Sequence, residues 1–91
     1  PMNITPEQSL IEYPCHFPIK VMGANVDGFF SAMVHVATAF DPGFDASTVE
    51  QRPSKAGNYM GLTLSVRVTS REQLDELYRT LTSHPMVKVV L

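Results

Sequence analysis

The sequence contains one cysteine and no tryptophan, and the shortage of cysteine excludes several classes of protein. Cys15 alone cannot form an internal disulfide or a zinc site built from cysteines. Chains without disulfides are typical of a reducing compartment. We therefore expect a cytoplasmic protein.

The sequence also has little charge and no long apolar run. Lys and Arg number 7, Asp and Glu number 9, and the formal net charge is -2, so no overall positive field attracts nucleic acid or anionic lipid. No apolar run approaches the roughly 20 residues that cross a bilayer. Residues 1–10 lack the basic and apolar regions of a signal peptide. We expect no membrane association.

The residues that are present suit one small globular domain. The 91 residues are 44% hydrophobic and 18% charged, which is ordinary for a folded domain and unlike a disordered tail. A chain of this length supports a single core. Residues 1–14 show no sustained period, so we expect an N-terminal tail there and the domain over residues 15–91.

Hydrophobic periodicity predicts six elements in the order strand, helix, strand, strand, helix, strand. Alternating residues predict strands over 15–22, 59–69 and 86–91, with a weaker edge strand over 46–52. A helical period predicts one helix that is capped by Asn25 and another that is capped by Ser70. This order is typical of the ferredoxin-like βαββαβ sandwich, an α+β fold. It has a four-stranded antiparallel sheet with two helices on one face.

The other face of this sheet is expected to lack a helical cover. Apolar strand residues must face the helices, so the residues between them line the open face. These are His16, Pro18, Lys20, Thr63, Ser65, Arg67, Met86, Lys88 and Val90. The open face would therefore offer cations and a few apolar groups to a ligand or partner.

No pattern of known catalytic or metal chemistry is present. Cys15 and His16 are neighbours on a strand and point to opposite faces, while His35 faces water on its helix. Zinc needs three or four converging ligands, and a nucleophilic side chain needs an oriented base. We predict no metal, no cofactor and no enzymatic activity.

Two turns have chemistry that suits a small anion. Residues 54–59 place exposed amides around Gly57, and residues 22–25 lie where a strand meets the positive end of a helix. Ordinary turns need Gly and Asn for the same backbone reasons, which is the more frequent case. The candidate ligand-binding residues are Gly23, Asn25, Ser54, Gly57, Asn58, Tyr59, Lys20 and Arg67.

Three segments together resemble a known family of small bacterial proteins. They are Phe17-Pro18-Ile19-Lys20-Val21-Met22-Gly23, Ser54-Lys55-Ala56-Gly57-Asn58-Tyr59 and Val87-Lys88-Val89-Val90-Leu91. Over residues 10–91 the chain resembles the YbeD family. The resemblance implies a domain similar to ACT regulatory modules, which bind amino acids or other small metabolites at subunit interfaces. Members often carry the label of lipoate regulatory protein.

The chain departs from this family at two positions. Similar proteins often have a hydroxyl residue where this chain has Gly61, and the lysine of the turn, Lys55, is shifted. The departures leave Ser54, Gly57 and Tyr59 as the better candidates in this segment.

We expect a small cytoplasmic protein with a regulatory role that binds a small acidic metabolite or a protein partner without catalysis. The alternative is a pure interaction module that pairs through the open sheet face with a partner protein or as a homodimer. Single-stranded RNA binding is the third possibility. RNA-binding sheets of this topology stack bases on central aromatic residues. Among the corresponding outward positions of this chain, the one aromatic residue expected is Tyr59, at the start of its strand. Nucleic acid is therefore an unfavoured partner.

Overall fold

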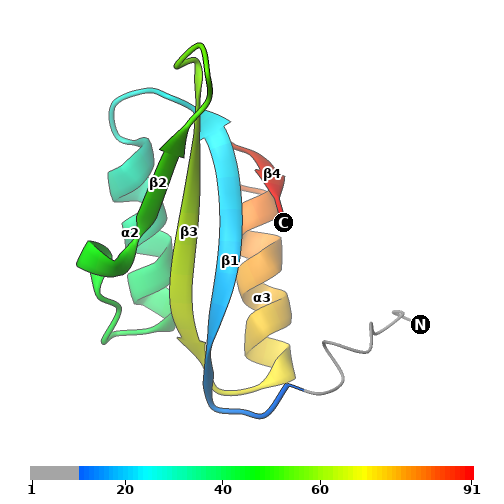
Figure 1. Cartoon of the computed structure of the whole chain (residues 1–91). Helices are drawn as coiled ribbons and strands as arrows, with labels where there is room; N and C mark the ends of the chain where they lie inside the picture. Colours follow the sequence, from blue (N-terminus) through cyan, green and yellow to red (C-terminus); the bar gives the residue numbers. More distant parts are fainter. Residues whose placement is uncertain (1–10) are drawn as a thin grey trace.

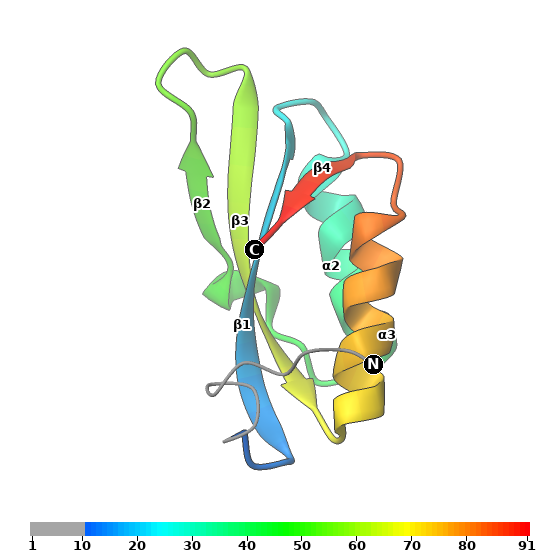
Figure 2. The same cartoon turned by 90° about the vertical axis from the view of Figure 1, so that its right-hand side faces the viewer.

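The structure, a computed structural model, describes residues 11–91 and has the expected order of elements (Figure 1). The elements are β1 (Cys15–Ala24), α2 (Phe29–Phe40), the 3₁₀ turn η1 (Ala46–Thr48), β2 (Glu50–Pro53), β3 (Tyr59–Val68), α3 (Arg71–Thr82) and β4 (Val87–Val90). All strand pairs are antiparallel, in the order β2-β3-β1-β4. Figure 2 shows both helices on one side of the sheet. The ferredoxin-like α+β prediction is confirmed.

Residues 1–10 of the predicted tail lie outside the described part of the chain, and the boundary at residue 15 stays a prediction. Within the described part, Ile11 and Tyr13 pack against the core.

The core lies between the helices and the central strand pair. β1 and β3 pair over their whole length, from Cys15 opposite Val68 to Ala24 opposite Tyr59. Alternate side chains of both strands are at most 1% exposed: Ile19, Val21, Leu62, Leu64, Val66 and Val68. The predicted alternation is therefore confirmed for these two strands.

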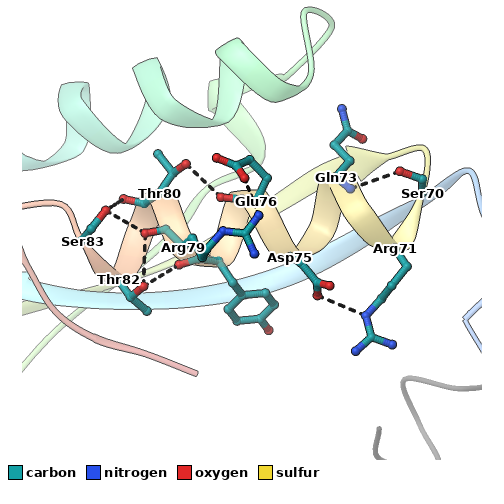
Figure 3. Close-up of polar contacts among 10 residues, drawn as sticks. Ser70, Arg71, Gln73, Asp75, Glu76, Arg79, Thr80, Thr82 and Ser83 are labelled. Carbon is teal, nitrogen blue, oxygen red and sulfur yellow. Dashed lines mark hydrogen bonds and ion pairs between the residues drawn. The ribbon is translucent and has the colours of Figure 1, made fainter. Parts of the chain in front are cut away.

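The start of α3 is fastened to the end of α2. The Ser70 hydroxyl accepts a hydrogen bond from the Gln73 backbone N–H at 3.1 Å, as its predicted capping role requires (Figure 3). The Gln73 side chain accepts from the Thr69 N–H at 2.7 Å and donates to the Phe40 carbonyl at 3.2 Å. One side chain thus links both helices and the end of β3.

The predicted start of α2 is wrong, and so is the predicted end of β1. The N-cap of α2 is Gly28, which has a φ of 89° and needs no side-chain cap. β1 continues past Met22 to Ala24, because Ala24 pairs with Tyr59. Asn25 therefore lies in the connecting loop and does not cap the helix.

The edge strand starts later than predicted. Residues 46–48 form η1, where the Asp45 carboxylate accepts from the Ser47 N–H, and only Glu50–Pro53 forms β2. β2 pairs with β3 alone, so its position at the sheet edge is confirmed.

Asp41 covers the part of β3 that β2 does not reach. β2 pairs with β3 only as far as Thr63. Beyond it the Asp41 carboxylate, 7% exposed, accepts from the Arg67 N–H at 3.0 Å and from the Gly43 N–H at 3.0 Å. A buried carboxylate thus satisfies an edge donor that lacks a strand partner.

A β-bulge lies in β4. Val87 is opposite Gly23 and Val89 is opposite Met22, so Lys88 is the additional residue. A bulge of one residue reverses the side-chain orientation of everything that follows it.

The bulge makes the predicted orientation of the residues that follow it wrong, whereas Val87 packs against the core as predicted. Val90, expected on the open face, packs against the core, and so does Met86, which precedes β4. Val89 and Leu91, expected in the core, are 45% and 70% exposed. The open face therefore gains two apolar side chains that the simple alternation had assigned to the interior.

Gly23 and Gly61 lie on neighbouring strands and have different surroundings. A Cβ atom at Gly23 would lie 2.3 Å from the Met86 carbonyl oxygen and 2.7 Å from the Phe29 ring. A Cβ atom at Gly61 would lie 3.4 Å from the Arg52 carbonyl oxygen, which is ordinary contact. Only Gly23 is required by close packing.

We predict that Gly23→Ala lowers the free energy of unfolding by about 1–3 kcal/mol, because a backbone carbonyl cannot rotate away from the added methyl group. Gly61→Ala is the matched control. It should be neutral or stabilising, since alanine is favoured over glycine in a strand by roughly 0.5–1 kcal/mol. Urea denaturation of both variants measures the difference, and equal losses would contradict the packing explanation.

Candidate functional site

The open face of the sheet carries a groove of about 430 Å³. All four strands and Leu91 contribute to its lining. Its most prominent side chains are Lys20, Met22, Arg52, Tyr59, Thr63 and Leu91. A volume of this size lies within the range of small-molecule sites, about 300–1,000 Å³.

The strand register arranges the groove in rows across the sheet. In one row Arg52 is opposite Gly61, and Gly61 is opposite Met22. Gly61 has no side chain, so the row is hollow at its centre. The next outward-facing residues of β3 lie two positions from Gly61, which is about 7 Å along the strand. The backbone of Gly61 is therefore partly exposed and forms the floor of the groove.

The next row of the groove adds charge. Glu50 is opposite Thr63, and Thr63 is opposite Lys20. Lys20 is paired in turn with Leu91, whose N–H donates to the Lys20 carbonyl at 2.8 Å. Lys20 and Leu91 thus lie beside each other at the β4 side of the groove.

Cationic side chains outnumber anionic side chains in the groove lining. Lys20 and Arg52 are the cations, and Glu50 is the anion. The ion pairs found among residues 11–91 lie within α3, and they join Arg71 to Asp75 and Arg79 to Glu76 (Figure 3). Neither Lys20 nor Arg52 forms an ion pair with a described residue, so both cations are available to an anion.

Apolar groups surround these cations. The exposed large hydrophobic side chains of the described chain are Met22, Val26, Tyr59, Val89 and Leu91. All except Val26 line the groove. Such a concentration of exposed apolar side chains at one place is common in binding surfaces.

The two predicted anion-binding turns contact each other. Asn25 of the β1–α2 loop donates from its backbone N–H to the Asn58 carbonyl at 2.9 Å. Its side-chain Nδ2 donates to the Gly57 carbonyl at 3.0 Å. The two turns therefore form one corner of the molecule.

The N–H groups of Ser54, Gly57 and Tyr59 are used within the chain. The Gly57 N–H donates to the Ser54 carbonyl at 2.9 Å. The Tyr59 N–H donates to the Ser54 hydroxyl at 3.0 Å, and the Ser54 N–H donates to the Tyr59 carbonyl at 2.9 Å. The hairpin closes on itself, so these amides do not present a free anion-binding nest.

The predicted candidates separate into groups. Lys20, Ser54 and Tyr59 line the groove. Gly57 and Asn58 form the corner with Asn25.

The remaining two candidates lie elsewhere. Gly23 is buried on the helix side of the sheet, beneath Phe29. Arg67 is exposed on the open face opposite His16, outside the groove lining.

Most residues of the groove lining were not among the predicted candidates, including Met22, Gly61, Val89 and Leu91. Strand alternation could have placed Met22 and Gly61 on the open face. It could not have placed Val89 and Leu91, since their orientation depends on the bulge.

Two pKa shifts occur outside the groove. Hydrogen bonds from the Ser47 hydroxyl and N–H lower the pKa of Asp45 below its ordinary value. Burial raises the pKa of Tyr78 on α3. Neither residue lines the groove.

Within residues 11–91 no three His, Cys, Asp or Glu side chains converge as metal ligands. None of the described helices combines the length and the apolar character that crossing a membrane requires.

These features define a small ferredoxin-like α+β domain with a grooved, uncovered sheet face. A family described as "Protein of unknown function (DUF493)" matches residues 8–91. The UPF0250 protein of Leptothrix cholodnii is 66% identical over 89 residues, which are 98% of each chain. The UPF0250 protein of Bordetella pertussis is 63% identical over 89 residues, again 98% of each chain. The chain belongs to the DUF493, or UPF0250, family, which confirms the resemblance to the YbeD proteins.

We predict that Asn25→Asp loosens the corner between the two turns. The variant keeps the backbone bond to Asn58 but replaces the Nδ2 donor with an oxygen that faces the Gly57 carbonyl. Amide hydrogen exchange over residues 54–59 should become several-fold faster, while global stability falls by about 1 kcal/mol or less.

Asn58→Asp is the control for this experiment, because it adds the same charge nearby and removes no side-chain hydrogen bond found among residues 11–91. Unchanged exchange in the Asn25 variant, or equal acceleration in both variants, would show that the Asn25 side chain does not hold the hairpin.

Proposed function

We propose that the protein binds a small molecule with an anionic group in the open-face groove, and that it acts by binding and not by catalysis. The cations Lys20 and Arg52 would receive the anionic group. Met22, Val89 and Leu91 would contact the apolar part of the molecule. A ligand-dependent regulatory role in the cytoplasm is the corresponding proposal for the cell.

One observation carries this proposal. Two cations without an ion-pair partner among the described residues line a hollow of about 430 Å³ together with most of the exposed large hydrophobic side chains. Charge and apolar surface occur together in sites for amphiphilic molecules, because the charge orients the ligand and apolar contact supplies affinity. The predicted turn site at Gly57 is less suited, since the N–H groups of Gly57 and Tyr59 already have partners.

The second candidate function is association through the same face. Its support is the set of exposed apolar side chains at the groove, above all Leu91, which is 70% exposed. A protein partner or a second copy of the chain would bury them. RNA binding has no comparable support, because Pro18, Ser65 and Thr63 occupy the central outward positions of β1 and β3.

We predict that anionic probes shift the backbone amide resonances of Gly61 and Thr63 in the full chain. The probes are amino acids, lipoate, nucleotides and 2-naphthoate. Lys20→Gln and Arg52→Gln should each weaken binding about three- to tenfold, since each removes one charge-assisted contact at an exposed site. NMR titration measures both effects.

Arg67→Gln is the matched control for these titrations. It removes one exposed positive charge from the same face but outside the groove, so affinity should change less than twofold. Equal weakening in all three variants would mean that net charge and not the groove attracts the anion. Unmoved Gly61 and Thr63 resonances with every probe would refute the proposal.

For the second candidate we predict a sedimentation coefficient that rises with concentration and a Leu91→Glu variant that remains monomeric. Val26→Glu is the control, because Val26 is 53% exposed but lies outside the groove. Monomeric sedimentation of the unmodified chain at all concentrations would remove self-association.

A further inference from the structure

Gly61 lies inside the central strand β3, and no close contact or positive φ angle requires glycine there. Among the described glycines, positive φ angles occur at Gly28 and Gly57, so the backbone at Gly61 is open to other residues. A Cβ atom there would meet nothing closer than the Arg52 carbonyl oxygen at 3.4 Å. Glycine weakens a strand interior, because it increases the entropy lost on folding and leaves nothing to pack. The loss of strand stability caused by glycine at this position therefore needs another explanation.

The missing side chain leaves a flat area of backbone at the groove floor. Arg52 and Met22 stand on either side of it on the neighbouring strands. Tyr59 and Thr63 stand before and after it on β3, pointing to the same face. Four side chains thus surround one bare peptide segment.

A flat floor with such walls selects for ligand shape. A planar ring can lie in contact with the Gly61 peptide groups over its whole area, whereas a puckered saturated ring touches them at a few atoms only. The Arg52 guanidinium and the Tyr59 ring both offer contacts that favour unsaturated rings. An acidic group on that ring would remain within reach of Arg52 and Lys20.

We propose that the ligand of the groove contains a planar unsaturated ring joined to an anionic group, and that Gly61 determines this selectivity by letting the ring lie on the backbone. The proposal rests on the proposed function, since it assumes an anion in the groove. It adds the ligand class and the specificity residue.

A matched pair of probes tests the proposal. 2-Naphthoate and decahydronaphthalene-2-carboxylate have the same carbon skeleton and charge but differ in planarity. NMR titration of the full chain should give at least about fivefold tighter binding of the planar probe. Gly61→Val, whose side chain would cover the floor, should reduce this preference to less than twofold.

The control variant is Ser65→Val. Ser65 lies on the same strand and points to the same face, but it does not line the groove. The Ser65→Val variant should therefore keep the preference of the unmodified chain for the planar probe. Gly61→Ala serves as the smaller change if the valine variant does not fold. It should reduce the preference at least twofold.

The outcomes separate the two proposals. Two results would overturn the role of Gly61 and leave anion binding intact. One is equal affinity of the unmodified chain for the two probes. The other is an unchanged preference for the planar probe in every Gly61 variant that folds. Failure of both probes and of the amino acids, lipoate and nucleotides to shift the groove resonances overturns the proposed function itself. A preference lost in the Gly61 variants and kept in Ser65→Val supports the inference.

Discussion

The antiparallel pairing of β1 with β3 is the interaction on which the rest of the structure depends. The two strands pair from Cys15 opposite Val68 to Ala24 opposite Tyr59 without interruption. A shift by one residue would exchange the buried and exposed sets on both strands. The register that buries Ile19 against the helices therefore also sends Lys20 to the open face. The core and the groove are two sides of one alignment.

Sequence periodicity predicted the parts of the fold that depend on local pattern. The alternation of β1 and β3, the apolar stripe of α3 and the Ser70 cap are confirmed, because each is encoded within a few residues. The orientation of β4 after Lys88 was wrong, since the bulge there exists only through pairing with β1. The start of α2 was wrong because Asn25 bonds to a hairpin more than 30 positions away. Contacts between distant segments leave no local periodicity.

The same distinction applies to the candidate site. Lys20, Ser54 and Tyr59 were candidates, and they line the groove. Leu91 was not, although it lines the same groove, because the end of the chain meets β1 only in the assembled sheet. The two turns were interpreted as separate anion sites. Asn25 of one turn instead donates a hydrogen bond to the other turn, and Ser54 and Tyr59 bond to each other, which gives the groove a stable corner near Tyr59.

Gly23 and Gly61 show how one sheet serves a core and a site at once. They are near neighbours on paired strands, since Met22 is opposite Gly61 and Gly23 is opposite Met60, and they belong to opposite faces. At Gly23 the missing side chain lets a helix residue and a backbone carbonyl approach, so the glycine serves packing. At Gly61 the nearest atom to an added Cβ would be the Arg52 carbonyl oxygen at 3.4 Å, and the space remains open on the surface. Substitution at Gly61 would therefore alter the groove while the pairing that builds the fold stays intact.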